Sequence, residues 1–194
     1  MYSLRRRRGS NVEYRLRVRV EGGHRVPSTF ILGQDGINMK IVSVKSSLLE
    51  EYRKIDNKML DTHGRPCLLV VRLKYKDKNR MFAVPFRSNI PGNVPKEQYF
   101  SLPPRSTTQN GKRHGIHYIK MFPVEKPFLE RYRLDTPSSS LCASILEKNK
   151  KKIIDDCQAY LTKYENGNCP SYSTSIDKMI EKLAQLYNED KENK

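Results

Sequence analysis

Two apolar runs separated by a short polar turn constrain the fold of this chain more than any other feature. The runs are CLLVVRLKY, residues 67–75, and RMFAVPF, residues 80–86. Residues 76–79 between them, KDKN, have the composition of a hairpin turn. Strands joined by so short a turn pair antiparallel, so we expect an antiparallel sheet built around this hairpin. Because Pro85 lacks a backbone donor, the second strand is expected to end or to reach a sheet edge there.

The segments around the hairpin mix strands with loops. A short strand is expected at 39–44, followed by an amphipathic helix over 46–60 that Ser46 or Ser47 can cap. Residues 91–113 contain several prolines and glycines, which predicts a long irregular loop. The sequence GIHYIKMFPV, residues 115–124, predicts one further strand.

The C-terminal third has the pattern of two helices. The first is predicted over 138–164, with a serine cap at its start and an end near Asn166 and Gly167. The second is predicted over 173–187, with Thr174 and Asp177 at the spacing of a capping box. Strands and helices that mix without regular β-α-β alternation favour an antiparallel α+β domain.

The net positive charge of the chain indicates which kind of molecule it binds. In 194 residues, 37 Lys and Arg face 21 acidic residues, which gives a net charge of +16. Such a field attracts polyanions, because each neutralised phosphate releases counterions. Nucleic acid is therefore the favoured partner, with an anionic membrane surface second and a merely basic solvated surface as the alternative. No apolar run is long enough to span a membrane and no secretory signal is evident, so we expect a soluble, cytoplasmic protein.

Residues 1–38 differ in composition from the rest of the chain. They hold eight Arg and three acidic residues, a net charge of +5, which leaves +11 for residues 39–194. An arginine-rich arm that binds nucleic acid is one interpretation. An expression tag or an over-extended start before Met39 is the other. We expect residues 39–194 to form a single domain and residues 1–38 to be a basic N-terminal extension outside the fold.

The cysteines and histidines do not form a metal-binding pattern. The four cysteines are scattered without a C-x-x-C pair, and the four histidines complete no zinc motif. A glycine-rich phosphate loop, an H-E-x-x-H motif and a paired-carboxylate cluster are also missing from the sequence. We therefore expect free thiols, no cofactor and no metal, and any chemistry is expected to be metal-free.

RNA is a substrate that can be cleaved without a metal, because its own 2′-OH can attack the adjacent phosphate. Such a site must orient the hydroxyl, move protons and stabilise charge on the phosphoryl oxygens. Arg87, Ser88 and Asn89 follow a buried strand and offer a cation, a hydroxyl and an amide. A guanidinium suits a phosphate oxygen. The alternative is a strand end at which Ser88 and Asn89 only satisfy nearby backbone groups.

A second group lies in KRHGIHYIK, residues 112–120. His114 and His117 titrate near neutrality and either can serve as acid or base. On a regular strand, Tyr118 and Lys120 would share one face while His117 points to the other, unless a bulge intervenes. A structural histidine and a core tyrosine are the alternatives.

A third, weaker group is DTHGRPC, residues 61–67, in which His63 and Arg65 precede a core strand. Nearby aromatic residues are candidates for stacking on unpaired bases. They are Tyr99, Phe100 and Phe86, the last of which also suits core packing.

Four segments taken in order resemble a known family. They are MKIVSVKSSLLEEYRKIDNK, RPCLLVVRLKY, FAVPFRSNIP and HGIHYIKMFPV, which run from Met39 to about Pro123 and precede a compatible helical C-terminus. As an ordered set they resemble the endoribonuclease toxins of type III toxin–antitoxin systems, the ToxN and AbiQ group.

The resemblance implies a compact, twisted antiparallel sheet or barrel similar to the MazF/Kid fold, with flanking helices. It also implies metal-independent RNA cleavage that leaves a 2′,3′-cyclic phosphate. The implied partner is a small repetitive RNA antitoxin, which the toxin processes and which inhibits it within a ring-like RNA–protein assembly. Many such toxins act in phage defence by abortive infection.

The family's Pro-x-x-Ser motif places its serine on Ser88, and the preceding residue, often threonine in the family, is Arg87 here. A lysine that some relatives carry two positions after the serine is Ile90, so that charge must come from elsewhere. The position after Arg-Pro, where an aromatic or basic residue is expected, holds Cys67.

These considerations assign residues to roles. The predicted catalytic residues are Arg87 and Lys120 for phosphate charge, Ser88 for positioning the 2′-OH or a phosphoryl oxygen, and His117 for proton transfer, which His114 is equally able to perform. The predicted RNA contacts are Asn89, Arg65, His114, Tyr118 and His63. The alternative function is a non-catalytic basic RNA-binding module. DNA recognition is disfavoured because no helix-turn-helix or zinc-finger pattern occurs.

Overall fold

The computed structural model describes residues 39–60, 66–134 and 136–192. Within them the chain forms seven strands and four α-helices with three short 3₁₀ turns. The strands are β1 Met39–Val44, β2 Cys67–Tyr75, β3 Lys78–Ile90, β4 Tyr99–Leu102, β5 Arg113–His117, β6 Phe122–Val124 and β7 Leu129–Arg131. The helices are α1 Ser46–Ile55, α2 Pro137–Lys148, α3 Lys150–Glu165 and α4 Ile176–Glu192, and the 3₁₀ turns are η1 Lys96–Gln98, η2 Tyr118–Lys120 and η3 Lys126–Phe128.

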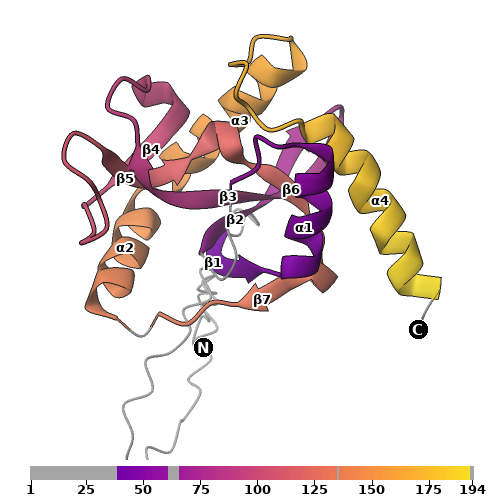
Figure 1. The fold of residues 1–194 in the computed structure, drawn as a ribbon, viewed down its shortest axis with the longest axis horizontal. Helices are drawn as coiled ribbons and strands as arrows, with labels where there is room; N and C mark the ends of the chain where they lie inside the picture. The colour runs from indigo at the N-terminus through magenta and orange to yellow at the C-terminus, as the bar shows by residue number, and fades with distance from the viewer. Residues whose placement is uncertain (1–38, 61–65, 135, 193–194) are drawn as a thin grey trace, which may run out of the picture.

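The expected β2–β3 hairpin lies at the centre of the sheet (Figure 1). The strand order is β4-β5-β3-β2-β1-β7, all pairs are antiparallel, and β6 also pairs with β3. In the part of the chain that the structure describes, β4 and β7 are the two edges and do not pair with each other. The sheet is therefore open and is not a closed barrel, and the predicted α+β class with an antiparallel sheet is confirmed.

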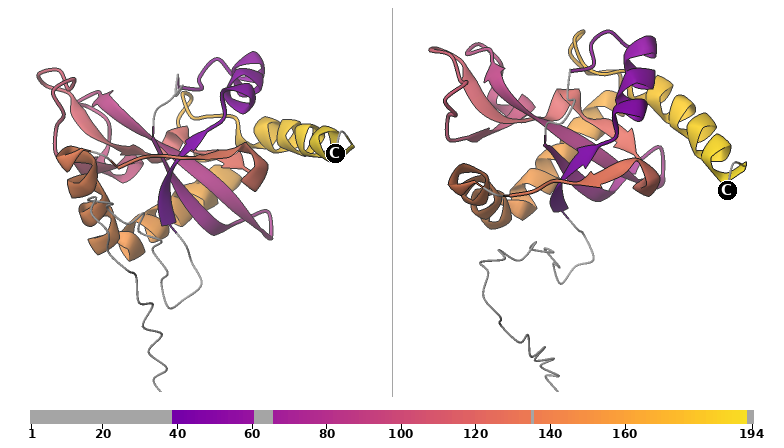
Figure 2. Two further views of the ribbon diagram at one scale, coloured as in Figure 1. Left: turned by 90° about the horizontal axis from the view of Figure 1, so that it is seen from below. Right: turned by 60° about the horizontal axis from the view of Figure 1, so that its bottom comes forward.

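Helices cover both faces of the sheet, which explains why β2 and β3 read as nearly continuous apolar runs. Leu68, Val70 and Val84 belong to a core cluster with residues of α2 and α3. Cys67, Leu69 and Ala83 alternate with them and join a second cluster with α1 and α4. Figure 2 shows α2 and α3 on one side of the strands and α1 and α4 on the other. Each central strand is thus buried on both faces.

The position of Pro85 corrects a prediction. Strand β3 does not end at Pro85 but continues to Ile90, in the middle of the sheet. The Phe86 N–H donates to Pro66 on the β2 side, so the nitrogen of Pro85 faces the opposite side. There β6 pairs with β3 only as far as Ala83, and β5 begins its pairing at Phe86. The proline thus lies at a junction between two partner strands, where no donor is needed.

The single strand predicted over 115–124 is wrong, because η2 separates β5 from β6. Both strands pair with β3: Ile116 lies opposite Phe86, and Phe122 lies opposite Ala83. Between these two pairs, β3 has only Val84 and Pro85, whereas the other chain segment has the five residues 117–121. The excess chain forms the 3₁₀ turn, closed by a hydrogen bond from the Met121 N–H to the Tyr118 carbonyl of 2.9 Å.

Helix boundaries also differ from the predicted ones. The helix expected over 138–164 is two helices that meet at Asn149, whose side chain donates to the Ile145 carbonyl. Helix α2 is capped by Thr136 in a capping box with Ser139, so the cap is not one of the serines. The predicted end near Asn166 and Gly167 is confirmed.

Helix α1 starts at Ser46 with Lys45 at its N-cap, so the serine cap is wrong, and it ends at Ile55 instead of residue 60. Part of the predicted loop 91–113 forms η1 and the edge strand β4.

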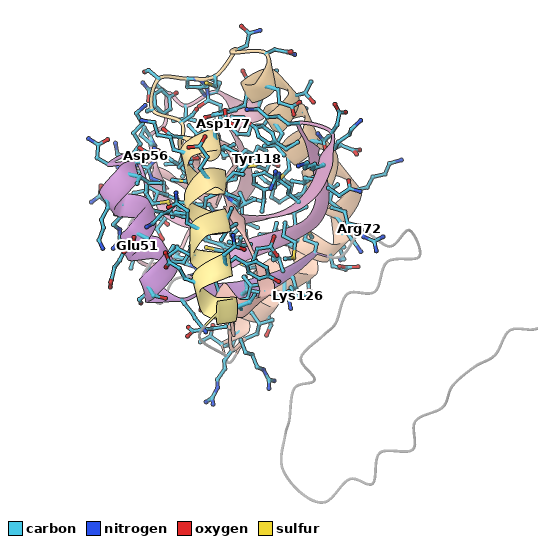
Figure 3. All side chains as sticks on the ribbon, turned by 90° about the vertical axis from the view of Figure 1, so that its right-hand side faces the viewer. Glu51, Asp56, Arg72, Tyr118, Lys126 and Asp177 are labelled. Carbon is cyan, nitrogen blue, oxygen red and sulfur yellow. The ribbon has the colours of Figure 1, made fainter. Side chains whose placement is uncertain are left out.

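Helix α4 packs beside α1 at the same side of the sheet (Figure 3). Its apolar face is turned toward the core, since Ile176, Met179 and Leu183 are buried. Lys182 links the two helices through Glu51 at 2.9 Å. The predicted capping box is wrong, because the Thr174 hydroxyl donates instead to the Met121 carbonyl at 2.6 Å. None of the helices in the described ranges is long and apolar enough to cross a membrane.

Candidate active site

A β-bulge places Ser88 and Asn89 at the surface end of β3. Arg87 lies opposite Gly115 on β5, but the next pair is Ile90 with Arg113, so β3 carries one extra residue between them. A bulge of this kind bends the strand and redirects its side chains. The bulge therefore explains how a buried strand presents Arg87, Ser88 and Asn89 as three half-buried polar residues in succession.

Arg87 lies against His117. One guanidinium nitrogen of Arg87 is 3.4 Å from Nδ1 of His117. Because a guanidinium only donates hydrogen bonds, Nδ1 is the acceptor and the proton of the neutral imidazole is on Nε2. Burial lowers the pKa of Arg87, so its positive charge is poorly compensated by solvent.

His117 is buried and neutral at neutral pH. Burial, followed by the charges of Arg87 and Lys120, lowers its pKa to about 3. Its Nε2 atom is buried and has no hydrogen-bond partner among the described residues. The ring thus combines an unprotonated nitrogen held by Arg87 with an N–H that is free to donate.

Lys120 is the second cation of the group, beside Arg87, and belongs to η2. Its amine donates to the carbonyls of Lys58, at 2.8 Å, and Tyr172. The pKa of Lys120 is lowered by burial and by Arg87, while Asp56 opposes this shift. The regular-strand alternation predicted for these residues ends at His117, the last residue of β5, because η2 follows it. His117 lies two residues after Gly115, the partner of Arg87, and so lies on the same face of the strand as that partner. We call Arg87, His117 and Lys120 the cationic cluster.

Asp56 is the acidic residue whose charge raises the pKa of Lys120, and it was not singled out by the sequence. It follows α1 and is buried, and it accepts hydrogen bonds from the backbone N–H groups of Lys58 and Ser175, at 2.9 and 2.6 Å. Figure 3 shows Asp56 at the end of α1 that lies near the start of α4. Asp56 and Lys120 together join the segment after α1 to the segment before α4. The sequence predicted a helix over 46–60, which placed Asp56 inside the helix instead of in the segment after it.

The other predicted site residues lie in different surroundings. Asn89 accepts from the Gln109 N–H at 2.9 Å and donates to the Thr107 carbonyl at 3.3 Å, so it anchors the loop before β5. His114 is buried beside Phe86, and its Nδ1 donates to the Pro103 carbonyl at 2.7 Å. Burial lowers the pKa of His114.

Tyr118 lies in the core, and its hydroxyl donates to Asp156 of α3 at 3.0 Å. Burial raises its pKa. Tyr118 is thus fully buried in the free protein, and its RNA contact stays a prediction. His63 and Arg65 lie outside the described residues.

The cationic cluster is suited to an anion. The three side chains come from β3, from the end of β5 and from η2, and they are mostly removed from solvent, where charge interactions are strong. A phosphate bound there would meet a guanidinium, an imidazole N–H and the field of an ammonium group. Within the described ranges, no three His, Cys, Asp or Glu side chains are grouped so as to hold a metal ion.

Sequence comparison adds little, since no family model matches the chain and no curated protein is significantly similar to it. Comparison of folds is more informative. A solved structure from a bacterial type III toxin–antitoxin system, in which a non-coding RNA pseudoknot inhibits the toxin, matches with a TM-score of 0.57. It is 17% identical and is aligned over 77% of this chain and 98% of its own.

Two further solved structures match similarly. One comes from a bacterial antiviral system regulated by a processed non-coding RNA, with a TM-score of 0.58 and 15% identity over 75% of this chain and 97% of its own. The other is AbiQ, a lactococcal anti-phage endoribonuclease of a type III toxin–antitoxin system. It has a TM-score of 0.55 and 15% identity over 78% of this chain and 98% of its own.

The chain has the fold of these solved structures, which we call the type III toxin fold after two of them. Nearly the whole length of each matched chain is aligned, so the match extends beyond a shared hairpin or helix pair. The type III toxin fold therefore confirms, at the level of architecture, the resemblance seen in four ordered segments of the sequence.

Proposed function

We propose that the protein is an endoribonuclease toxin of a type III toxin–antitoxin system. The observation that carries this proposal is the cationic cluster beside the bulged Ser88, within the fold of solved type III toxins. Neither feature suffices alone, because a fold hosts many activities and a group of buried cations is often structural. The proposed substrate is cellular or phage RNA in the cytoplasm.

In the proposed reaction the ribose 2′-OH attacks the adjacent phosphorus and the bond to the leaving O5′ breaks, which leaves a 2′,3′-cyclic phosphate. Arg87 binds a non-bridging phosphate oxygen, and Ser88 holds the 2′-OH or a second oxygen. Movement of Arg87 onto the phosphate frees Nδ1 of His117, the unprotonated nitrogen that takes the 2′-OH proton. A proton from solvent returns to O5′. Lys120 stabilises the charge of the transition state.

The phosphate itself prepares His117 for this role. In the free protein, burial and two neighbouring cations hold the pKa of His117 at about 3, too low for an efficient base. A bound phosphodiester adds a negative charge beside the ring, which raises this pKa toward neutrality. The base is thus activated only when the substrate is present.

The proposed regulator is a small repetitive RNA antitoxin, which the toxin cleaves from its precursor and which then inhibits it in an RNA–protein assembly. The net charge of +16 supports binding of such a polyanion. We further propose that cleavage needs no metal and that the system acts in phage defence.

A non-catalytic RNA-binding module is the second candidate. It is favoured by the hydrogen bonds that the cluster already makes: Nδ1 of His117 accepts from Arg87, and Lys120 donates to two carbonyls. In this alternative the same cations hold phosphates without moving protons.

The two candidates differ in their products. Purified protein is incubated with single-stranded RNA in excess EDTA, and the new 3′ ends are analysed. We expect fragments that end in a 2′,3′-cyclic phosphate, and no fragments from an Arg87→Met variant that melts at the wild-type temperature. Intact RNA that is nevertheless bound by folded protein would favour the binding module. Cleavage that stops in EDTA would contradict the metal-free mechanism.

A further inference from the structure

Tyr172 is an exposed aromatic residue at the border of the cationic cluster. In the ranges that the structure describes, Leu141 and Tyr172 are the large hydrophobic side chains that are exposed, and Tyr172 is 44% accessible. It lies in the segment between α3 and α4, at the top of the view in Figure 1. An exposed aromatic ring costs hydrophobic free energy unless a ligand covers it.

The backbone carbonyl and the side-chain hydroxyl of Tyr172 both form hydrogen bonds near the cationic cluster. Its carbonyl accepts a hydrogen bond from the Lys120 amine, and its hydroxyl donates to Gln98 at 3.1 Å. Gln98 ends η1 and is followed by Tyr99, which pairs directly with His117. The ring of Tyr172 therefore extends from Lys120 toward the strand that flanks His117.

The ring is not needed to hold its own segment in place. The segment is anchored by the Thr174 N–H and hydroxyl, which donate to the Ile119 and Met121 carbonyls, and by Ser175, which donates to Asp56. None of these bonds involves the Tyr172 side chain. The hydrogen bond from its hydroxyl to Gln98 is exposed, so it contributes little to stability but fixes the direction of the ring.

The aromatic residues suggested by the sequence are less accessible. Tyr99 and Phe86 are each only 5% exposed, and Phe100 is partly buried against the core. An unpaired base that lies next to the cationic cluster thus has Tyr172 as its accessible aromatic neighbour. Stacking on such a ring is favourable for every base, because each has a π face.

We propose that Tyr172 is a stacking platform for an unpaired base of the RNA whose phosphate occupies the cationic cluster. The phosphate and the stacked base would then fix the strand at two points, which orients the nucleotide that reacts. Gln98 is a positioning residue in this arrangement, because it holds the ring through its hydroxyl. This inference rests on the proposed function in that it needs RNA at the cluster.

The test uses two strands that the protein cannot cleave. One is a fluorescein-labelled 12-nucleotide strand of mixed sequence with 2′-O-methyl groups throughout. The other is a strand of the same length that carries the same sugars and phosphates without bases. Binding to both is measured by anisotropy for the full-length wild-type protein and for Tyr172→Leu, Tyr172→Phe and Gln98→Ala, with melting temperatures as the folding control.

We expect Tyr172→Leu to weaken binding of the base-containing strand about tenfold, the usual effect of one lost stacking contact. Binding of the strand without bases should not change. Tyr172→Phe keeps the ring and should bind nearly as well as wild type, and Gln98→Ala should lie between the two.

Equal binding of the base-containing strand by Tyr172→Leu and wild type would overturn the stacking role. An equal loss for both strands would also overturn it, since it would indicate a change in the phosphate site or in the fold. If the wild-type protein bound neither strand and left RNA intact, the proposed function would fail together with this inference. If the wild-type protein cleaved RNA and the Tyr172→Leu variant bound the base-containing strand as tightly as wild type, the stacking role would be contradicted while the proposed function would stand.

Discussion

At the residue scale, hydrogen bonds organise the cationic cluster, and in the proposed function a bound phosphate would replace some of them. Arg87 donates to His117, and Lys120 donates to two carbonyls, so each buried cation has partners in the free protein. Such partners lower the cost of burying charge, which is large for an isolated ion. The bond from Arg87 to His117, at 3.4 Å, is longer than the 2.8 Å bond from Lys120 to the Lys58 carbonyl, so we expect a bound phosphate to draw Arg87 away before Lys120.

Ser88→Ala tests the carry-over of the family's serine to this chain. The substitution removes one hydroxyl at the bulge and should leave the fold intact, because the side chain is only half-buried. We expect RNA cleavage to fall at least tenfold, in keeping with the loss of a hydrogen bond to the reacting group. In cells that lack the antitoxin, growth arrest should be relieved.

A suitable control for Ser88→Ala is Ser140→Ala, an exposed position on α2 that should have no effect on cleavage or growth. A Ser88→Ala protein that remains as active and as toxic as wild type would show that the serine has no role in the reaction.

The low pKa of His117 predicts how stability depends on pH. The folded protein protonates His117 only near pH 3, whereas an unfolded chain does so near ~6.5. The unfolded state therefore binds more protons between these values, so stability falls as the pH falls through this window. Between pH 7 and 5 the loss due to His117 should be about 1 to 2 kcal/mol.

Urea unfolding of wild type and His117→Gln at pH 7 and pH 5 measures this contribution. The variant should lose less stability on acidification, although His114, whose pKa is also lowered, leaves part of the dependence in place. The same loss in both proteins would contradict the assignment of a depressed pKa to His117.

At the scale of elements, the site depends on how β4, β5 and β6 are arranged along β3. The bulge at Ser88 and the turn η2 both arise because these strands pair with β3 in registers that do not match residue for residue. Strand β5 must also approach β4 closely. At Gly115 an added Cβ would lie 2.1 Å from the Phe100 carbonyl oxygen, far inside van der Waals contact.

Gly115→Ala should therefore push β4 and β5 apart. We expect a loss of about 2 to 3 kcal/mol in the free energy of unfolding, the scale of overpacking in a rigid environment. Activity should fall as well, since Gly115 pairs with Arg87. The measurement is urea unfolding together with RNA cleavage.

Gly111→Asn is the matched control for Gly115→Ala. Gly111 has a φ of 71° with no atom near its missing Cβ, and asparagine tolerates that region. The control should lose less than about 1 kcal/mol. A Gly115→Ala protein as stable as the control would show that β4 adjusts freely.

At the scale of the whole molecule, the domain has a sheet covered on both faces and a charge that exceeds what folding requires. The two core clusters on either side of the sheet contain buried residues from each of β1, β2 and β3. The net charge of +11 on residues 39–194 is available for binding a polyanion without the basic segment before them. Folding and RNA binding are thus both expected to reside in residues 39–194.

A chain that begins at Met39 tests this division. It should melt within about 2 °C of the full-length protein, because residues 39–192 already supply two extensive core clusters. It should also retain cleavage, with RNA affinity that still falls steeply as salt rises. A drop of ten degrees or more would show that residues 1–38 contribute to the stability of the fold.

Much of the architecture could be predicted because it depends on local pattern. The apolar runs of β2 and β3, the short turn between them and the helical periodicity of α1 and α4 are all contained in neighbouring residues. Predictions failed where pairing at a distance overrode the local pattern. Pro85 remains in a central strand because its partners change there, and residues 115–124 break into β5, η2 and β6 for the same reason.

The sequence by itself determined the antiparallel α+β class, the excess of positive charge and the polar triplet at Arg87, because these follow from composition and periodicity. Only the tertiary structure decided which distant residues join that triplet. His117 lies beside Arg87 because of the β3–β5 register, Lys120 joins the cluster from η2, Tyr118 belongs to the core, and Asp56 and Tyr172 contribute from segments next to α1 and α4. The physical reason is strand register, since a shift of one residue along β3 changes which side chains meet.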